Sequence, residues 1–412
     1  MSTISEERLD SGHGGAPSGF KLGMLLNDTR YRSYTFQFIA LVLLILSISY
    51  LVSNLIANLE EAGLNISWAF LAEPAGYDIN QRPIEYDSQS THARASIVGA
   101  INTLIVAFLA CVTATILGVV AGVLRLSNNW IVARLMSVYV EAFRNVPVLI
   151  WILIIFLAMS NAFPQPRAFR GEAPDAEMWL GLFAFTNRGV YAPSFINGAG
   201  STIFWIVCVL SIVGVFAYRR YAKKLLYDTG RLLPMGWPSL AILIVPPVLA
   251  FFLLGSPVSL ETPELRGFNF QGGVHLRLSL IALWFALAIY TGAFIAENVR
   301  AGIMAISKGQ TEAAGALGLR PGRIMNLVIL PQALRVIIPP LISQYLNITK
   351  NSSLAIAVGY MDITGTLGGI TLNQTGRAIE AILLLMLFYL LVSLAISAIM
   401  NVYNNSVKLK ER

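Results

Sequence analysis

Residues 97–124 read IVGAINTLIVAFLACVTATILGVVAGVL and contain no aspartate, glutamate, lysine or arginine. About 20 mostly apolar residues in a helix are enough to cross a bilayer, and this segment is longer than that. Seven further segments have the same character, at residues 36–57, 132–162, 201–218, 238–255, 276–302, 333–349 and 378–402. The sequence therefore predicts an all-α integral membrane protein with about eight transmembrane helices.

The composition of the 412-residue chain agrees with this prediction. Only 12% of the residues are charged and 56% are hydrophobic, and the mean hydropathy is +0.67. A soluble domain has about 25% charged residues. These values exclude a soluble enzyme, a disordered regulator and a nucleic-acid binder. The formal net charge of +7 is expected from basic cytoplasmic loops.

Cysteines and histidines form no pattern that indicates a site. Cys111 and Cys208 both lie inside apolar segments, and His13, His92 and His275 are far apart in the chain. The sequence therefore predicts neither a disulfide framework nor a metal site.

The charges of the loops predict the orientation of the helices. Lysine and arginine dominate segment 219–237, whereas acidic residues outnumber basic ones in loop 58–96. Both ends of the chain carry basic residues close to the outermost spans. By the positive-inside rule, 219–237 and both termini are expected in the cytoplasm, and 58–96 and 163–200 outside.

Two of the predicted spans are interrupted. Arg144-Asn145-Val146-Pro147 divides the third into an amphipathic lead-in and a span from about residue 147. Pro339-Pro340 removes two amide donors from the seventh and predicts a break there. Interrupted backbone is tolerated in lipid only where protein or a cavity surrounds it, so both sites indicate the working centre.

Between the sixth and seventh spans, residues 307–335 read SKGQTEAAGALGLRPGRIMNLVILPQALR. Residues 312–319 contain good helix formers, and Arg320-Pro321-Gly322 is expected to end that helix. A short exposed helix with small residues and one acid is suited to docking a partner. From composition alone, a plain interfacial amphipathic helix is the alternative.

This segment resembles the EAA loop of binding-protein-dependent ABC importer permeases. Glu312-Ala313-Ala314, Gly318 and Val328-Ile329-Leu330-Pro331 follow that family's order, with Val328 where isoleucine is usual. Other segments resemble the polar amino-acid branch (MetI-like, HisMQ type) of the family, and the chain is most similar to the Q-subunit type of general L-amino-acid importers (Aap/Bzt type). These segments are Tyr139–Pro147, Tyr290 with Glu297 and Arg300, Gly309-Gln310, Leu330–Arg335 and Lys350–Leu354.

The resemblance implies a five-helix type I ABC importer core, formed here by spans two, three, six, seven and eight. Four parts of the chain are then expected. They are a cytoplasmic tail at 1–33, an additional first helix and periplasmic loop at 34–94, the importer transmembrane domain at 95–405 with an insertion of two extra helices at 163–270, and a cytoplasmic tail at 406–412.

The resemblance also implies a function. It is that of a permease subunit which translocates L-amino acids across the bacterial inner membrane by alternating access. The implied partners are a second permease subunit, two ATPase subunits that bind ATP and magnesium, and a periplasmic amino-acid-binding protein. The resemblance implies that the chain holds no catalytic residue, cofactor or metal of its own. It contains no Walker A pattern, so the nucleotide chemistry is expected on a partner.

Two alternatives remain. One is an ABC importer for another small solute, such as an opine or a peptide. The other is an ion-coupled secondary transporter, which would commonly show inverted repeats, and the two halves show no similarity beyond hydropathy.

Candidate site residues fall into two groups. For coupling to the ATPase, the resemblance implies Gly309, Gln310, Glu312, Ala313, Ala314 and Gly318. For the substrate pathway, polar residues in or beside apolar spans are candidates, because such residues are expensive in a membrane. They are Asn102, Thr103, Asn347, Lys350 and Asp362, with helix capping or bonding between helices as the alternative for each.

Two charged positions receive structural interpretations. Glu297 lies three residues before Arg300, which favours an ion pair within one helix over a ligand. Arg144 is expected to hold the inner gate region or a lipid phosphate.

Overall fold

The computed structural model of the chain describes residues 26, 29–61, 63, 66–171 and 174–407. The chain divides into two compact units, Met1–Ser67 and Trp68–Arg412. In the first unit, helix α2 (Thr29–Glu61) is long and apolar enough to cross a membrane, and most of its apolar side chains are exposed. This helix contains the first predicted span.

Helices make up most of the second unit. Its α-helices are α3 (His92–Leu124), α4 (Trp130–Arg144), α5 (Val148–Ala162), α6 (Ser201–Thr229), α7 (Gly236–Leu253), α8 (Leu278–Met304), α9 (Lys308–Ala316), α10 (Pro321–Ile324), α11 (Leu330–Asn351), α12 (Leu372–Thr375) and α13 (Ala378–Val407). Short 3₁₀-helices are η1 (Ala69–Ala72), η2 (Pro166–Phe169) and η4 (Ser352–Val358), and π-helical turns are η3 (Met325–Ile329) and η5 (Thr364–Thr371). Eight candidate membrane spans occur in the described residues, which confirms the predicted number.

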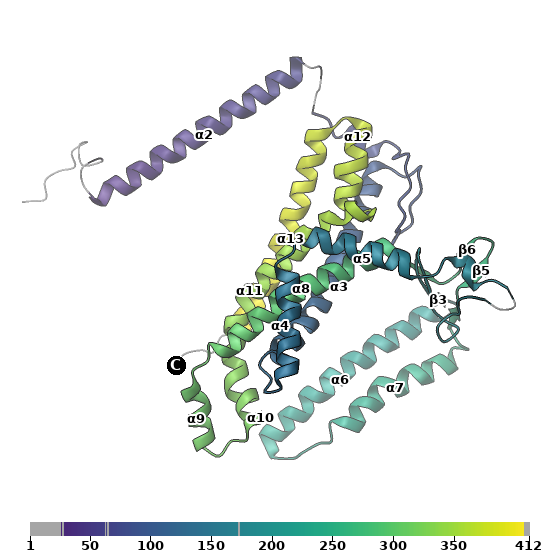
Figure 1. Cartoon of the computed structure of the whole chain (residues 1–412), viewed down its shortest axis with the longest axis vertical. Helices are drawn as coiled ribbons and strands as arrows, with labels where there is room; N and C mark the ends of the chain where they lie inside the picture. The colour runs from purple at the N-terminus through teal and green to yellow at the C-terminus, as the bar shows by residue number, and fades with distance from the viewer. Residues whose placement is uncertain (1–25, 27–28, 62, 64–65, 172–173, 408–412) are drawn as a thin grey trace, which may run out of the picture. The chain divides into compact units, whose positions relative to one another are not determined.

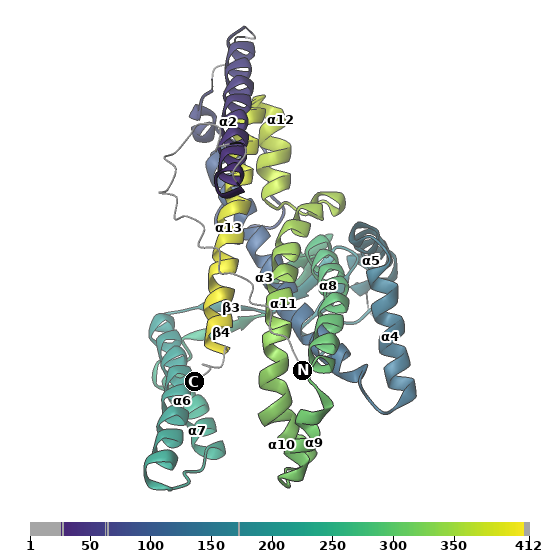
Figure 2. The ribbon, with the colours of Figure 1, turned by 90° about the vertical axis from the view of Figure 1, so that its left-hand side faces the viewer.

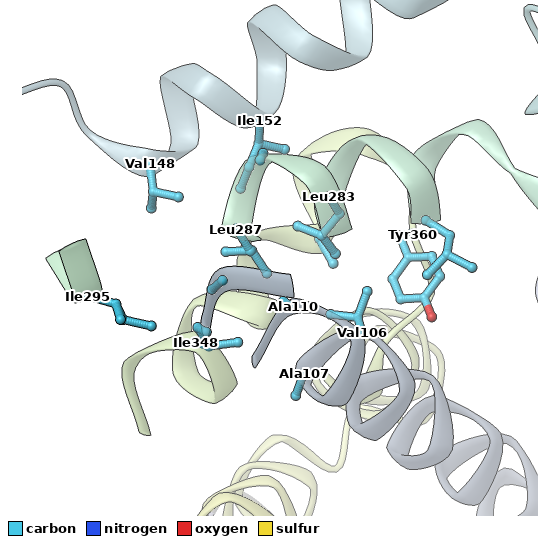
Figure 3. Close-up of a cluster of buried hydrophobic side chains, with 14 of the residues drawn as sticks. Val106, Ala107, Ala110, Val148, Ile152, Leu283, Leu287, Ile295, Ile348 and Tyr360 are labelled. Carbon is cyan, nitrogen blue, oxygen red and sulfur yellow. The ribbon is translucent and has the colours of Figure 1, made fainter. Parts of the chain in front are cut away.

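Helix α8 is the centre of the second unit. In an apolar stretch of 18 residues of α8, 67% of the residues are buried. The helix packs against α3, α4, α5 and α11. The approach of α3 depends on small residues, because a Cβ atom on Gly118 would come within 2.5 Å of Ile295. Figure 3 shows side chains from α3, α5, α8 and α11 facing one another in this core, among them Val106, Ile152, Leu283, Leu287 and Ile348.

The third predicted span is divided as the sequence indicated. The amphipathic helix α4 ends at Arg144, and α5 begins at Val148 directly after Pro147. Proline is well suited to this position because a helix start needs no amide donor there.

The predicted break at Pro339-Pro340 is wrong. Helix α11 continues through both prolines from Leu330 to Asn351. A proline removes one helical hydrogen bond, but neighbouring helices and local adjustments can compensate for it in a membrane segment. The regular helix ends only at Ser352, where the 3₁₀-helix η4 begins.

Residues 184–277 contain short strands that the sequence did not predict. They are β1 (Ala184–Thr186), β2 (Gly189–Ala192), β3 (Ser194–Asn197), β4 (Val258–Glu261), β5 (Glu264–Arg266), β6 (Asn269–Gln271) and β7 (Val274–Arg277). All pairings are antiparallel and form three small sheets, ordered β1-β2-β7, β3-β4 and β5-β6. A small core of Ala184, Tyr191 and Phe270 joins the β1-β2-β7 and β5-β6 sheets, and we call the three sheets together the strand subdomain.

This strand subdomain lies at one end of a helical hairpin formed by α6 and α7. Strand β3 precedes α6 and strand β4 follows α7, and the two strands pair with each other. Helices α6 and α7 pack on one another, with Gly214 close to Ile242. Residues 184–277 therefore contain two apolar helices with a strand cap at one end of them.

Candidate functional site

The loop between α8 and α11 presents a small exposed helix. Figure 1 and Figure 2 show α9 and α10 at the end of α11 that lies away from α12. Of the six predicted coupling residues, only Ala314 is buried, and the other five are exposed: Gly309, Gln310, Glu312, Ala313 and Gly318. Buried Ala314 and Ile324 hold α9 against α10 and η3. The arrangement can present one carboxylate and several small side chains to another protein.

The limits of this helix differ from the predicted 312–319. Helix α9 begins at Lys308 and ends at Ala316. Gly318 follows with φ +76°, and its amide donates to the carbonyl of Gly315 over 2.9 Å. A left-handed glycine just after a helix is a common stop signal, so Gly318 ends the helix before Arg320-Pro321-Gly322 is reached.

A polar junction joins α3 to the segment between η4 and η5. We define it as Asn102, Thr103, Tyr360, Met361, Asp362 and Ile363. The Asn102 side chain donates to the carbonyl of Met361 over 2.9 Å, and Thr103 accepts from the amide of Ile363 over 3.1 Å. The Tyr360 hydroxyl donates back to the carbonyl of Asn102 over 3.0 Å.

The three predicted pathway residues of the junction are closed to solvent. Asn102, Thr103 and Asp362 each have 0% exposure. The Asp362 carboxylate accepts from the amide of Gly365 over 2.8 Å and from the Tyr389 hydroxyl of α13 over 3.5 Å. The backbones of α3 and η5 lie close together here, because a Cβ atom on Gly99 would come within 2.1 Å of Thr366. Three of the five predicted pathway residues therefore lie together, and hydrogen bonds satisfy most of their polar groups, although the Oδ1 atom of Asn102 has no partner in the described residues.

The other two predicted pathway residues lie elsewhere. Asn347 and Lys350 are exposed on α11. Neither side chain forms a hydrogen bond or an ion pair with the polar junction in the described part of the chain. The sequence grouped Asn347 and Lys350 with Asp362 because all three were expected near one end of the seventh span. In the structure both side chains lie on the exposed side of α11, away from the junction.

Replacing Thr103 with valine is expected to destabilise the protein. The variant removes the acceptor for the buried Ile363 amide, and an unsatisfied buried donor costs about 1–3 kcal/mol. We expect the apparent Tm of the purified complex to fall measurably, by up to a few degrees. Thr229→Val is the matched control, because Thr229 bonds only to its own helix and is exposed. Equal Tm values for the two variants would contradict the bonding role of Thr103.

A cluster of four charged residues joins the end of α3 to α4 and α8. Glu297 pairs with Arg125, with Arg144 over 3.5 Å and with Arg300 over 3.3 Å. The Glu297–Arg300 contact confirms the predicted ion pair within α8. Arg144 also lies over the Phe294 ring, 5.3 Å from its centroid. One carboxylate thus holds three helices together through three guanidinium groups.

Sequence reasoning missed two parts of this arrangement. Arg125 was not singled out, although it directly follows the uncharged segment 97–124 and so lies where a span meets water. Tyr389 lies inside an apolar segment, and nothing in that segment indicates that its hydroxyl donates to the Asp362 carboxylate.

Comparison with known proteins gives concordant results. The family model described as "Binding-protein-dependent transport system inner membrane component" matches residues 211–408. The chain is 52% identical over 419 residues to the glutamate/glutamine/aspartate/asparagine transport system permease protein BztB of Rhodobacter capsulatus, covering 96% of this chain and 98% of that one. It is 41% identical over 395 residues to the general L-amino acid transport system permease protein AapQ of Rhizobium johnstonii, covering 96% and 97%. A solved structure described as an amino acid ABC transporter with histidines shares 20% identity and a TM-score of 0.44, covering 76% of this chain and 95% of that one.

Proposed function

The chain belongs to the family of binding-protein-dependent transport system inner membrane components, and from this membership we propose that it is the permease subunit of an ABC importer that carries L-amino acids across the bacterial inner membrane. The observation that carries the proposal is identity of 41–52% along almost the whole length of two amino-acid permeases. The eight candidate spans support it independently. As a multi-span permease, this chain would be a transport subunit, and we assign ATP hydrolysis to a partner subunit.

The proposed assembly contains four kinds of protein. This chain pairs with a second permease subunit, two ATPase subunits dock beneath the pair, with α9 and α10 of this chain seated in a cleft of one of them, and a periplasmic binding protein delivers the amino acid. The exposed coupling residues Gly309, Gln310, Glu312 and Ala313 support the docking position, because they form a small-residue surface with one acid. ATP and magnesium belong to the ATPase subunits.

The chain offers a continuous route from the ATPase surface to the polar junction. Helix α9 packs on η3, η3 leads directly into α11, and α11 continues through η4 to Tyr360. Movement of α9 by the ATPase would therefore be passed along α11 to the junction. ATP can favour one pore state only if the closed ATPase binds that state better than the other. A continuous connection from α9 to the junction would allow the two pore states to differ in their affinity for the ATPase.

The proposed substrate pathway runs beside the polar junction. A groove of about 500 Å³ lies against the η4–η5 segment, with Asn373 and Gln374 among its lining residues. The Oδ1 atom of Asn102 is buried and has no hydrogen-bond partner in the described residues. If the junction separates during transport, Asn102, Thr103 and Asp362 would become available to the amino acid. Asn347 and Lys350 remain exposed candidates on α11.

Reconstituted transport tests the proposal. The chain should be purified with its neighbouring gene products and placed in liposomes that contain ATP, with the binding protein added outside. We expect uptake of several L-amino acids that requires both ATP and the binding protein. Uptake of an opine or a peptide in place of amino acids would contradict the substrate class, and uptake driven by an ion gradient without ATP would contradict the importer mechanism.

The proposed orientation predicts a labelling difference. Single cysteines at Asp87 and Lys223, in a chain lacking Cys111 and Cys208, should react differently with a membrane-impermeant thiol reagent. Both positions are exposed, so burial does not confound the comparison. Asp87→Cys should be labelled from the periplasmic side and Lys223→Cys only after the membrane is opened. The reverse pattern would show that the orientation is inverted.

A further inference from the structure

A polar cavity lies where the strand subdomain meets the helical core. Its volume is about 360 Å³, within the range of small-ligand sites. The strand subdomain contributes Asn187, Arg188, His275 and Arg277, and helix α8 contributes Ser279. The cavity shares no lining residue with the polar junction or with α9 and α10.

The cavity carries positive charge that nothing on its wall neutralises. Arg188 and Arg277 both line it, and no aspartate or glutamate does. Neither arginine forms an ion pair within the described residues. Arg277 uses its Nε to donate to the carbonyl of Asn80 over 2.9 Å, which fixes the guanidinium at the cavity edge.

Two further features add to the positive potential. Helix α8 starts at the cavity, its first residue follows Arg277, and no side chain caps that end. The positive end of a long helix favours an anion. His275 stacks on Tyr191 with the ring centroids 4.0 Å apart. Burial, together with repulsion from Arg277, lowers the pKa of His275, so this side chain is neutral near pH 7 and leaves the two arginines as the charged groups.

The cavity also offers an acceptor. The Oδ1 atom of Asn187 is buried and has no hydrogen-bond partner in the described residues. An unpaired buried acceptor is costly, and a ligand with a donor would satisfy it. Cations and an unpaired carbonyl oxygen on one wall match a molecule that has both a carboxylate and an ammonium group.

We propose that this cavity is an outer binding site for a free α-amino acid, with the carboxylate on Arg188 and Arg277 and the ammonium on the Asn187 oxygen. The inference rests on the proposed function for the presence of amino acids at this face. Val358, the last residue of η4, also lines the cavity. The ligand would therefore rest beside Gly359, which has a left-handed φ of +69° and leads from η4 into the polar junction.

Equilibrium binding of radiolabelled L-glutamine to the purified permease–ATPase complex, without the binding protein, tests the site. Arg188→Gln and Asn187→Ala should each raise the Kd about tenfold or more, because each removes a hydrogen bond to a charged group. Arg266→Gln is the matched control. Arg266 lies in the same subdomain, is exposed and pairs with Glu264 outside the cavity, so its Kd should equal that of the wild type.

Two analogues assign the contacts. Glutaramate lacks the ammonium group, so Asn187→Ala should not weaken its binding further. 4-Aminobutanamide lacks the α-carboxylate, so Arg188→Gln should not weaken its binding further. Loss of these selective effects would overturn the assignment of the two ends of the ligand.

The outcomes separate this inference from the proposed function. If the wild-type complex imports amino acids but Arg188→Gln and Asn187→Ala bind L-glutamine as the wild type does, the outer site is wrong and the function stands. If Arg188→Gln weakens only the docking of the binding protein, the cavity receives an acidic side chain and the inference is likewise overturned. Absence of ATP-driven uptake by the wild type would instead reject the proposed function.

Discussion

Replacing Gly318 with aspartate is expected to abolish ATP-driven uptake while the chain still inserts into the membrane. Gly318 has φ +76°, which costs other residues about 1–2 kcal/mol, although aspartate tolerates it better than most. The larger effect is the new carboxylate at a protein contact, where an unpaired desolvated charge costs several kcal/mol. We expect the ATPase subunits to dissociate or to hydrolyse ATP without transport. Uptake in liposomes, ATP hydrolysis and co-purification of the subunits measure this.

Gly318→Asn separates charge from backbone conformation. Asparagine tolerates the left-handed region and has nearly the same size as aspartate, but it carries no charge. It should retain much of the uptake that Gly318→Asp loses. A Cβ atom on Gly318 meets nothing within 4 Å among the residues that the structure describes, so neither variant creates a clash with them. Normal uptake by Gly318→Asp would contradict docking of the ATPase at this loop.

The second large effect is expected at Glu297. Glu297→Gln leaves Arg125, Arg144 and Arg300 without their shared anion. Loss of one partner from a buried ion pair costs about 3–5 kcal/mol, but Glu297 is 27% exposed, and solvent reduces this to roughly 2 kcal/mol. We expect a lower yield of assembled complex and a lower apparent Tm, measured by size-exclusion chromatography and thermal unfolding.

A rescue variant and a control make this prediction specific. Arg125 is the most buried of the three arginines, with 8% exposure of its side chain. Adding Arg125→Gln to Glu297→Gln removes the most costly unpaired cation and should restore part of the Tm. Glu264→Gln breaks an exposed pair with Arg266 and should leave the Tm unchanged. A Glu297→Gln protein as stable as Glu264→Gln would show that the cluster does not hold the helices together.

Helix number and type could be predicted because they depend on local sequence. Each span is an apolar segment of sufficient length, and the gap at Asn145–Pro147 follows from proline chemistry within a few residues. The five-helix core and the domain limits stay predictions, since the family model matches only residues 211–408 and begins inside α6.

Features that depend on distant contacts could not be predicted. The bond from Asn102 to Met361 joins residues 259 positions apart, so no local pattern reveals it. The continuation of α11 through Pro339-Pro340 depends on its neighbours in the same way. Strands β5 and β6 did leave a signal, because Gly267 begins a two-residue turn between short strand-like segments. In a chain dominated by apolar helices that signal was overlooked.

The pairing of β2 with β7 constrains how the protein is made. Gly189 pairs with Arg277, so the second partner leaves the ribosome only after α6 and α7 have been synthesised. During translation, the edge of β2 that pairs with β7 therefore stays unpaired while α6 and α7 are inserted into the membrane. A chain truncated before β7 would carry unpaired strand edges. Biogenesis of this subunit therefore contains a late closing step, before which the unpaired strands are exposed to proteases and chaperones.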